Sequence, residues 1–267
     1  MKVINILKNQ KPSLSFEVFP PKKETSFESV ERAVQAIAAI KPAYMSVTYG
    51  AGGGTSKYTL EIAKSIKEKY GVENILALRG DIPADMIGLD RSAWAYNHAT
   101  ELIRELKETN PDFCIGAACY PEVHPESRNS KEDILFLKAK VEAGCEFLTT
   151  QMFFDNNLLY SFLYKLREAG VTVPVVAGIM PITKANQVER AIKLSGCHVP
   201  QRFISLVDRF GNDEDAMKQA GIAYATDQII DLFANGVSNV HVYSMNKPDV
   251  AKKIYSNLSD IIGKSYE

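Results

Sequence analysis

A single carboxylate interrupts an apolar run near the start of the chain. In SLSFEVFPPKKE, residues 13–24, Glu17 stands between Phe16 and Val18, and the run ends at two prolines. Burying an ionised carboxylate among apolar side chains is very unfavourable. Glu17 is therefore either an exposed residue on one face of an edge strand or a buried acid. A buried acid would have a raised pKa and could donate a proton near neutral pH.

A glycine-rich segment, TYGAGGGTS, occupies residues 48–56. Its glycines would let backbone N–H groups approach a ligand closely, and the helix expected after it would offer its positive end. It is not a dinucleotide fingerprint, because position 55 is threonine, and it is not a P-loop, because Lys57 follows Ser56. A ligand-binding loop and a flexible turn both remain open at this point.

Two further segments place polar side chains directly after apolar runs. In LALRGDIP, residues 76–83, Arg79 and Asp81 flank a glycine that permits a sharp turn. These two residues could form a structural ion pair or contact a ligand. In FLTTQMFFD, residues 147–155, Gln151 lies among aromatic residues. Its amide could read the edge of a ligand, or it could be a hydrogen-bonded amide of the core.

The segment AACYPEVHPE, residues 117–126, places Tyr120 and His124 in a loop braced by proline. A lone histidine is more often structural than catalytic, so its type alone does not assign it a role. The sequence contains no H-E-x-x-H motif and no histidine cluster, so it does not support metal catalysis. It also has no G-x-S-x-G motif, which argues against hydrolase chemistry.

The elements that must position these residues alternate between short β-rich runs and amphipathic helices. Such alternation predicts an α/β protein with a parallel sheet, and polar residues at the ends of the strands favour the rim of a TIM-type (β/α) barrel. No linker divides the chain, so we expect one barrel domain over residues 1–267. Seven strands are predicted, over residues 14–19, 44–49, 75–78, 113–119, 147–153, 173–179 and 240–243.

The count of seven strands is one short of a (β/α)8 barrel. The remaining β-like segment, FISLVDRF at residues 203–210, lies among helical patterns and is better interpreted as a helix. Either one strand is hidden or one β/α unit is absent.

Composition narrows the classes of partner. The chain of 267 residues is 46% hydrophobic and 24% charged, with a net charge of −1, which argues against nucleic-acid or membrane-surface binding through bulk charge. No apolar run is long enough to span a bilayer, and the first residues do not resemble a signal peptide. The four cysteines lack C-x-x-C spacing, so we expect buried thiols in a cytoplasmic protein.

Taken together, the segments resemble the bacterial methylenetetrahydrofolate reductase family in its short form. The matching stretches run in family order, from SFEVFPPK and SVTYGAGGGTS through ILALRGDIP, AACYPEVHPE and FLTTQMFFD to GIMPI and HVYSMN. The resemblance implies an FAD-dependent oxidoreductase of folate and one-carbon metabolism, including methionine biosynthesis. In it, NADH or NADPH reduces FAD, and the flavin passes hydride to 5,10-methylenetetrahydrofolate in a ping-pong reaction. A homo-oligomer is expected, with a redox partner subunit as a further possibility.

The resemblance also assigns roles to individual residues. Glu17 would be the general acid that assists opening of the methylene bridge, and no metal is expected. Lys247 stands where many relatives carry arginine, a change from a planar fork to a point charge. The implied folate contacts are Asp81, Gln151, Gln187 and Lys247. The implied FAD contacts are Thr48, Tyr49, Ala51, Arg79, Gly80, Asp81, Tyr120, His124, Asp133 and Lys140.

One departure from the family lies between Tyr70 and Asn74. Relatives have a complete β/α unit of about thirty residues there, including a strand whose histidine faces the flavin. Here three residues make the connection, which accounts for the count of seven strands. The barrel would then close with seven strands, remain split or be completed by another subunit. An alternative function follows, a non-catalytic protein that binds folate or a redox partner.

Overall fold

The computed structural model describes residues 1–19, 27–48, 71–80 and 96–265. Three of the predicted site residues, Tyr49, Ala51 and Asp81, lie outside these ranges. The other predicted site residues can be placed in the fold.

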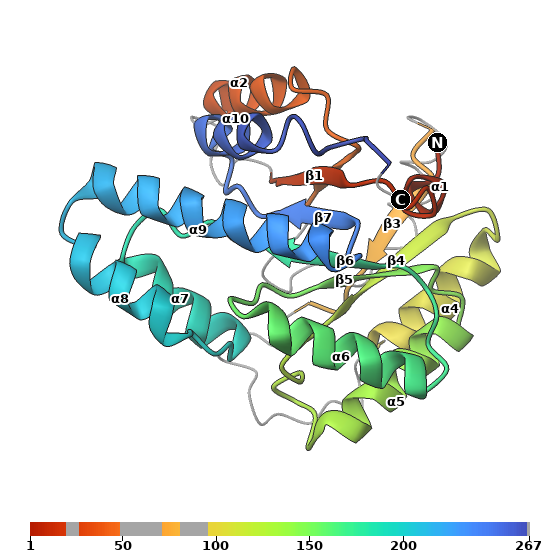
Figure 1. Ribbon diagram of the computed structural model, residues 1–267. Helices are drawn as coiled ribbons and strands as arrows, with labels where there is room; N and C mark the ends of the chain where they lie inside the picture. Colours follow the sequence, from red (N-terminus) through yellow and green to blue (C-terminus); the bar gives the residue numbers. More distant parts are fainter. Residues whose placement is uncertain (20–26, 49–70, 81–95, 266–267) are drawn as a thin grey trace.

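Seven parallel strands form one sheet in the order β2-β1-β7-β6-β5-β4-β3 (Figure 1). Each strand coincides with one of the seven predicted runs, so the prediction of seven β/α units is confirmed. The sheet curls into a half-barrel of the TIM type. The strands are β1 (Ser13–Val18), β2 (Met45–Val47), β3 (Asn74–Ala77), β4 (Cys114–Cys119), β5 (Phe147–Thr150), β6 (Val175–Ile179) and β7 (Asn239–Val242).

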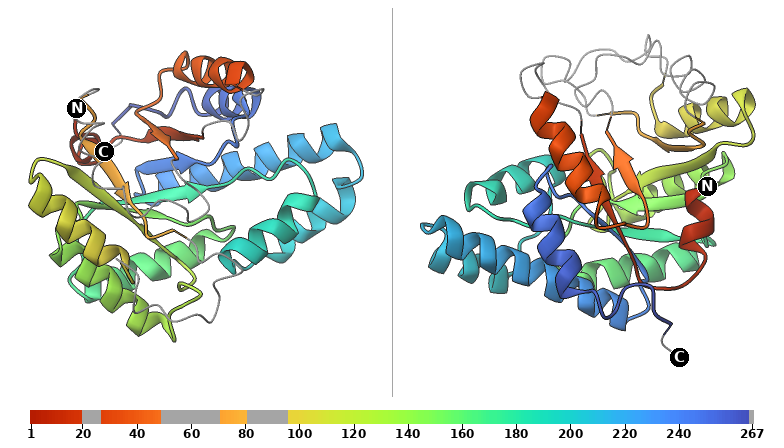
Figure 2. Two further views of the ribbon diagram at one scale, coloured as in Figure 1. Left: turned by 180° about the vertical axis from the view of Figure 1, so that it is seen from behind. Right: turned by 90° about the horizontal axis from the view of Figure 1, so that it is seen from above.

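Helices alternate with the strands and cover the outer face of the sheet. Figure 2 shows α2 and α10 side by side on one flank and α4 and α5 together on another. The segment FISLVDRF lies in α8, which confirms its interpretation as a helix. The described helices are α1 (Val3–Leu7), α2 (Phe27–Ala38), α4 (Ala99–Thr109), α5 (Ser130–Glu142), α6 (Asn156–Glu168), α7 (Asn186–Ser195), α8 (Gln201–Phe210), α9 (Glu214–Ala234) and α10 (Pro248–Asn257).

The alternation of side chains along β1 shows how the core is divided. Leu14, Phe16 and Val18 are almost completely buried and belong to the main apolar cluster between the strands and the helices. Because successive side chains of a strand point to opposite faces, Ser15 and Glu17 face the inside of the barrel. The same strand therefore supplies both core packing and a polar lining.

The amino-terminal end of the barrel is filled by α1. Val3, Ile4 and Leu7 pack in one buried cluster with Phe147 of β5 and Val176 of β6. The α1 helix is also tied to β3, because the Val3 N–H donates to Asn74 Oδ1 at 2.7 Å. Substrate access from this end of the barrel is therefore blocked by apolar side chains.

The sheet is open between β2 and β3, the strands on either side of the predicted missing unit. Among the described residues, β2 pairs with β1 alone and β3 with β4 alone. Apolar side chains on these edges are accessible to solvent: Val47 is 70% exposed, Leu78 is 47% and Leu76 is 41%. Within the described residues, the sheet is therefore split between β2 and β3, which is one of the three predicted arrangements.

Two further expectations concern membrane-spanning helices and the four cysteines. Within the described ranges, no helix is both long enough and apolar enough to cross a bilayer. All four cysteines are buried as free thiols.

Candidate active site

The carboxyl ends of the strands meet at one rim, as predicted for a parallel barrel. Because neighbouring strands are parallel and in register, residues that are distant in the chain become neighbours there. The rim carries these predicted site residues, in the order of their strands: Glu17, Thr48, Arg79, Tyr120, Gln151 and Lys247.

Glu17 and Thr48 come together at the ends of β1 and β2. The Thr48 hydroxyl donates to Glu17 Oε1 at 2.7 Å, and Ser46 lies opposite Glu17 in the register of the two strands. Burial raises the pKa of Glu17, and the hydrogen bond from Thr48 opposes this shift. Glu17 is thus a half-buried acid, and the raised pKa favours a proton on its carboxyl group.

Gln151 follows β5 and is half-buried. Its backbone N–H donates to the Cys119 carbonyl at 2.8 Å, and its side-chain oxygen accepts from the Met152 N–H at 2.9 Å. Its amide nitrogen has no hydrogen-bond partner within the described ranges. The side chain therefore combines both interpretations from sequence, with an oxygen held by the protein and a nitrogen that can donate to a ligand.

Arg79 makes an ion pair across the rim. Its guanidinium donates to both carboxylate oxygens of Glu126 and, at 3.3 Å, to the Asn97 carbonyl. A bidentate pair of this kind fixes the plane of the guanidinium. An ion pair of Arg79 with Asp81 was one interpretation of the sequence, and Asp81 lies outside the described residues; the partner that the structure gives Arg79 is Glu126. Gly80 makes the expected sharp turn, with a φ of +86°.

The loop after β4 is organised by a buried carboxylate at the start of α5. That helix begins at Ser130 because the Asn129 side chain accepts from the Glu132 N–H at 3.0 Å, which places Asp133 in the first turn. The Asp133 carboxylate accepts from the His124 N–H at 3.3 Å and from the Ser127 hydroxyl at 3.0 Å. Asp133 therefore holds the loop in one conformation.

His124 is held against Tyr120, with ring centroids 4.5 Å apart in an edge-on arrangement. Its Nδ1 accepts from the Glu126 N–H at 3.1 Å, so the proton of the neutral ring is on Nε2. Burial is the main cause that lowers the pKa of His124, which favours this neutral form. The ring can donate a hydrogen bond from Nε2.

Lys140 lies two turns after Asp133 on α5 and reaches under β4. Its Nζ donates to the Ala118 carbonyl at 2.8 Å, and burial lowers the pKa of the amine. Arg79, His124, Asp133 and Lys140 thus belong to one connected region around the β4–α5 loop.

Gln187 and Lys247 form a second connected region, between the loops after β6 and β7. Lys247 Nζ donates to the Thr183 hydroxyl at 2.7 Å, and that hydroxyl donates to Gln187 Oε1 at 3.2 Å. The same Gln187 oxygen also accepts from the backbone N–H groups of Thr183 and Lys184. The Gln187 oxygen is therefore used by the protein, and its amide nitrogen is the group that can face a ligand.

Sequence reasoning missed three residues of the rim: Glu126, Thr183 and Tyr243. Glu126 and Thr183 complete the two regions above. Tyr243 follows β7, and its hydroxyl donates to the Thr150 carbonyl at 2.7 Å. The available signal was its place two residues after His241, which puts both side chains on the inner face of the barrel.

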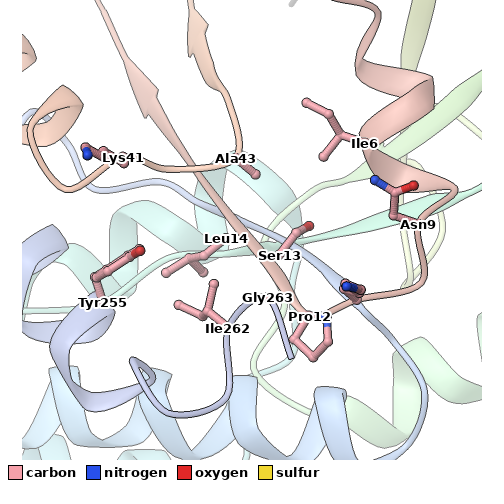
Figure 3. A pocket seen from close by; sticks show the side chains of 11 residues that line it. Ile6, Asn9, Pro12, Ser13, Leu14, Lys41, Ala43, Tyr255, Ile262 and Gly263 are labelled. Carbon is pink, nitrogen blue, oxygen red and sulfur yellow. The ribbon is translucent and has the colours of Figure 1, made fainter. Parts of the chain in front are cut away.

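A cavity of about 250 Å³ lies at the opposite end of β1 (Figure 3). Its lining includes Ser13 and Leu14 of β1 together with Lys41, Tyr255 and Ile262. None of the predicted site residues lines it. Across the part of the chain that the structure describes, no group of three or more His, Cys, Asp or Glu side chains could hold a metal ion.

Comparison with known proteins identifies a family model described as methylenetetrahydrofolate reductase. It matches residues 2–73 and 67–259, and the two matched segments overlap where one β/α unit is expected to be missing. A 5,10-methylenetetrahydrofolate reductase from Pectobacterium carotovorum is 31% identical, over 92% of this chain and 90% of the relative. The enzyme of that name from Escherichia coli K12 is 30% identical with the same coverage.

Longer relatives also match. The protein named methylenetetrahydrofolate reductase (NADH) 1 from Zea mays is 28% identical over 96% of this chain, which spans 50% of that relative. Among solved structures, a Clostridium thermocellum protein described as binding two copies of 5-methyl-5,6,7,8-tetrahydrofolic acid has the same fold. Its TM-score is 0.63 at 16% identity, over 97% of this chain and 98% of that one.

Proposed function

The chain belongs to the methylenetetrahydrofolate reductase family, and we propose that it reduces 5,10-methylenetetrahydrofolate to 5-methyltetrahydrofolate with NADH or NADPH through bound FAD. The observation that carries this proposal is the half-buried Glu17 at the rim, hydrogen-bonded to Thr48 and with a raised pKa. The methyltetrahydrofolate bound by the Clostridium thermocellum protein of the same fold supports a folate as the ligand.

Glu17 acts in this proposal as the general acid. Its proton goes to a nitrogen of the methylene bridge, the carbon–nitrogen bond to that atom breaks, and the methylene carbon becomes an electrophilic iminium. Addition of hydride to that carbon gives the methyl group. A carboxyl group can donate a proton near neutral pH when its pKa is raised, which is the effect of burial on Glu17. Thr48 keeps the carboxyl group in place at 2.7 Å.

The β4–α5 loop and its neighbours have the chemistry to hold FAD. Arg79 and Lys140 are cationic groups for a pyrophosphate, and His124 can donate from Nε2. Among the described residues, nothing lies within 4 Å of a Cβ atom built on Gly80, beside Arg79. When bound, FAD would accept hydride from the nicotinamide and deliver it to the folate. The proposed contacts are Thr48, Tyr49, Ala51, Arg79, Gly80, Asp81, Tyr120, His124, Asp133 and Lys140.

The folate contacts in this proposal divide between two places on the rim. The free amide nitrogen of Gln151 would donate to the pterin ring, with the Asp81 carboxylate as the complementary acceptor. Gln187 and Lys247, linked through Thr183, would meet the tail of the substrate. The Lys247 amine has its pKa lowered mainly by burial.

The visible absorbance spectrum of the purified protein tests the cofactor directly. The expected result is a yellow protein, as isolated or after incubation with FAD, whose flavin bands bleach when NADH or NADPH is added without oxygen. Reoxidation by methylenetetrahydrofolate would complete the cycle. A protein that stays colourless with excess FAD contradicts the proposal.

A second candidate is a non-catalytic protein that binds folate or a redox partner. The observation favouring it is the opening between β2 and β3, beside the residues proposed to hold FAD. This candidate predicts folate binding by calorimetry without any reductase turnover. Measurable turnover by the chain alone would eliminate it.

A further inference from the structure

A tight turn over residues 244–247 joins β7 to α10 at the rim of the barrel. The Lys247 N–H donates to the Ser244 carbonyl at 3.0 Å, and the two central residues, Met245 and Asn246, have φ angles of +56° and +53°. Two successive residues in the left-handed region are typical of a type I′ turn, which favours glycine, asparagine or aspartate at both positions. Asn246 meets this preference and Met245 does not, so the turn is strained at Met245.

The Asn246 side chain binds the backbone just beyond the end of β1. Its Oδ1 accepts from the Phe19 N–H at 3.1 Å, and its Nδ2 donates to the Phe19 carbonyl at 2.8 Å. The amide of asparagine carries the same kinds of donor and acceptor as a peptide group. It therefore takes the place of a neighbouring strand at Phe19, beyond Phe16 and Val242, the last pair in the register of β1 and β7.

Two further side chains of the turn reach neighbouring segments. The buried Ser244 hydroxyl donates to the Glu17 carbonyl at 3.4 Å, and Lys247 Nζ donates to the Thr183 hydroxyl at 2.7 Å. Strained backbone persists only where the surrounding contacts determine its conformation, and these side chains supply such contacts. The turn therefore connects the strand that carries the proposed acid with the loop that carries the proposed contacts for the folate tail.

On its other side, the end of β1 is bound to the residue that holds the Glu17 carboxyl group. The Thr48 N–H donates to the Val18 carbonyl at 3.1 Å, and the Thr48 hydroxyl donates to Glu17 Oε1 at 2.7 Å. Residues 17–19 are therefore held between Thr48 on the β2 side and Asn246 on the β7 side. Removing the Asn246 amide would free one of these two sides.

We propose that Asn246 is a positioning residue, whose amide fixes the end of β1 and so places the Glu17 carboxyl group for its reaction with the folate. The proposal rests on the proposed role of Glu17 as the general acid. The side-chain oxygen and nitrogen of Asn246 are both bonded to Phe19, so the residue contributes to the placement of the acid and not to the binding of a ligand.

Asn246→Gly removes the amide with the least disturbance of the turn, because glycine adopts the left-handed conformation readily. Misplacement of a reacting group by about 1 Å can cost about 10²-fold in rate, so we expect the folate half-reaction to slow by about ten- to a hundredfold at saturating folate. The dissociation constant of the folate and the rate of flavin reduction by the nicotinamide should be unchanged, since no ligand contact is lost.

Asn74→Gly is the matched control. The Asn74 amide makes the same kind of double contact, with Oδ1 accepting from the Val3 N–H at 2.7 Å and Nδ2 donating to the Met1 carbonyl at 3.0 Å. These contacts lie at the amino-terminal end of the barrel, so the control should leave the folate half-reaction unchanged. Near-ultraviolet circular dichroism checks that both variants are folded.

A double-mutant cycle with Glu17→Gln separates positioning of the acid from a general loss of structure. Because Asn246 acts through Glu17, Asn246→Gly should cause no further loss of rate in protein that already carries Glu17→Gln. Stopped-flow oxidation of the reduced flavin by methylenetetrahydrofolate measures these rates. An unchanged rate in folded Asn246→Gly overturns the proposal, as do fully additive losses in the double variant or an equal loss in Asn74→Gly.

Amide hydrogen exchange, followed by NMR, tests the same role without turnover. Asn246→Gly should speed exchange at the Phe19 amide and also at the Thr48 amide, which is bonded to β1 from the other side. Faster exchange at Phe19 alone would show a purely local contact and overturn the proposal. A wild-type protein that binds FAD but never reduces folate contradicts the proposed function, and the exchange measurement then still decides whether Asn246 fixes the Glu17–Thr48 pair.

Discussion

The two sides of the half-barrel are built in different ways. On the β1–β7–β6–β5 side, the sheet is continuous, and the inner face carries Glu17 beside Tyr243, with His241 hydrogen-bonded on both ring nitrogens. On the other side, β2 and β3 end the sheet, and Val47 and Leu78 are exposed.

This difference separates the proposed proton chemistry of Glu17 from the proposed cofactor site. Glu17 belongs to β1, which pairs with β7 on the continuous side, although its carboxyl group accepts from Thr48 at the end of the edge strand β2. The residues proposed to hold FAD lie nearer the opening, and side-chain contacts such as the Arg79–Glu126 ion pair organise them. The four predictions below test this contrast, from the largest expected effect to the smallest.

Replacing Glu17 by Gln should abolish the acid function on the continuous side. We expect folate reduction to fall by about 10²- to 10⁴-fold, the usual contribution of a general acid, with flavin reduction by the nicotinamide retained. Stopped-flow absorbance resolves the two half-reactions. Glu146→Gln is the control, since Glu146 pairs with Lys107 just before β5, at the opposite end of the sheet. Equal loss of both half-reactions would remove Glu17 from its proposed role.

Val18 of β1 and Val47 of β2 are paired in the register of the two strands. Substituting each of them compares the stability contribution of the core with that of the sheet edge. Val18 is 2% exposed and Val47 is 70% exposed. Val18→Ala should lower the free energy of unfolding by about 2 kcal/mol, because it removes buried methyl groups. Val47→Ala should change it by less than about 0.5 kcal/mol. Urea unfolding measures both, and an equal loss at Val47 would show that this edge is covered in solution.

His241 predicts a pH dependence of stability. Its pKa is about 4 in the folded protein and about 6.5 when unfolded, so the unfolded chain binds the extra proton between these values. Stability is therefore full above pH 6.5 and is lost as the pH falls towards 4. The His241 contribution should fall by about 2 kcal/mol between pH 7 and pH 5.

Urea unfolding at the two pH values measures this effect. In His241→Gln, the change in stability between pH 7 and pH 5 should be smaller by that amount. His198→Gln, at an exposed histidine, should keep the dependence of the wild type. The same dependence in His241→Gln as in the wild type would contradict the assignment.

On the open side, Glu126→Gln should weaken FAD binding. The change removes the charge that holds the Arg79 guanidinium, and because the pair is partly exposed we expect a loss of about three- to tenfold in affinity. Flavin fluorescence during titration measures the dissociation constant. Glu132→Gln, in a pair with the exposed Arg128, is the control. Unchanged affinity in Glu126→Gln would separate the ion pair from the cofactor site.

The fold was predictable from sequence to the extent that the neighbours of a residue along the chain determine whether it lies in a strand or a helix. All seven strands were found because short β-rich runs alternate with amphipathic helices, and 203–210 was correctly predicted as helix from its surroundings. The side-by-side placement of Glu17 and Thr48 follows from parallel strands of adjacent units. The position of the opening followed from the missing unit, although the sheet order was needed to show that β2 and β3 become edges.

Contacts between side chains of distant segments could not be predicted in this way. The Arg79–Glu126 pair and the chain from Lys247 through Thr183 to Gln187 depend on which loops approach each other. Tyr243 was missed for a different reason. A tyrosine next to an apolar strand is typical of a core residue. The sequence does not indicate that the Tyr243 hydroxyl crosses Gly178, which leaves room for the ring, to reach the Thr150 carbonyl.

The pairing of the first strand with the last also determines when the acid site can form during synthesis. Ser15 and His241, which lie beneath Glu17, are 226 residues apart in the chain. Contacts of such separation form late and slow folding, because a long loop must be closed before they can form. In a nascent chain that has not yet released β7 from the ribosome, the strand that pairs with β1 beside Glu17 is still missing. The surroundings of Glu17 on the β7 side therefore form only after nearly the whole chain has been made.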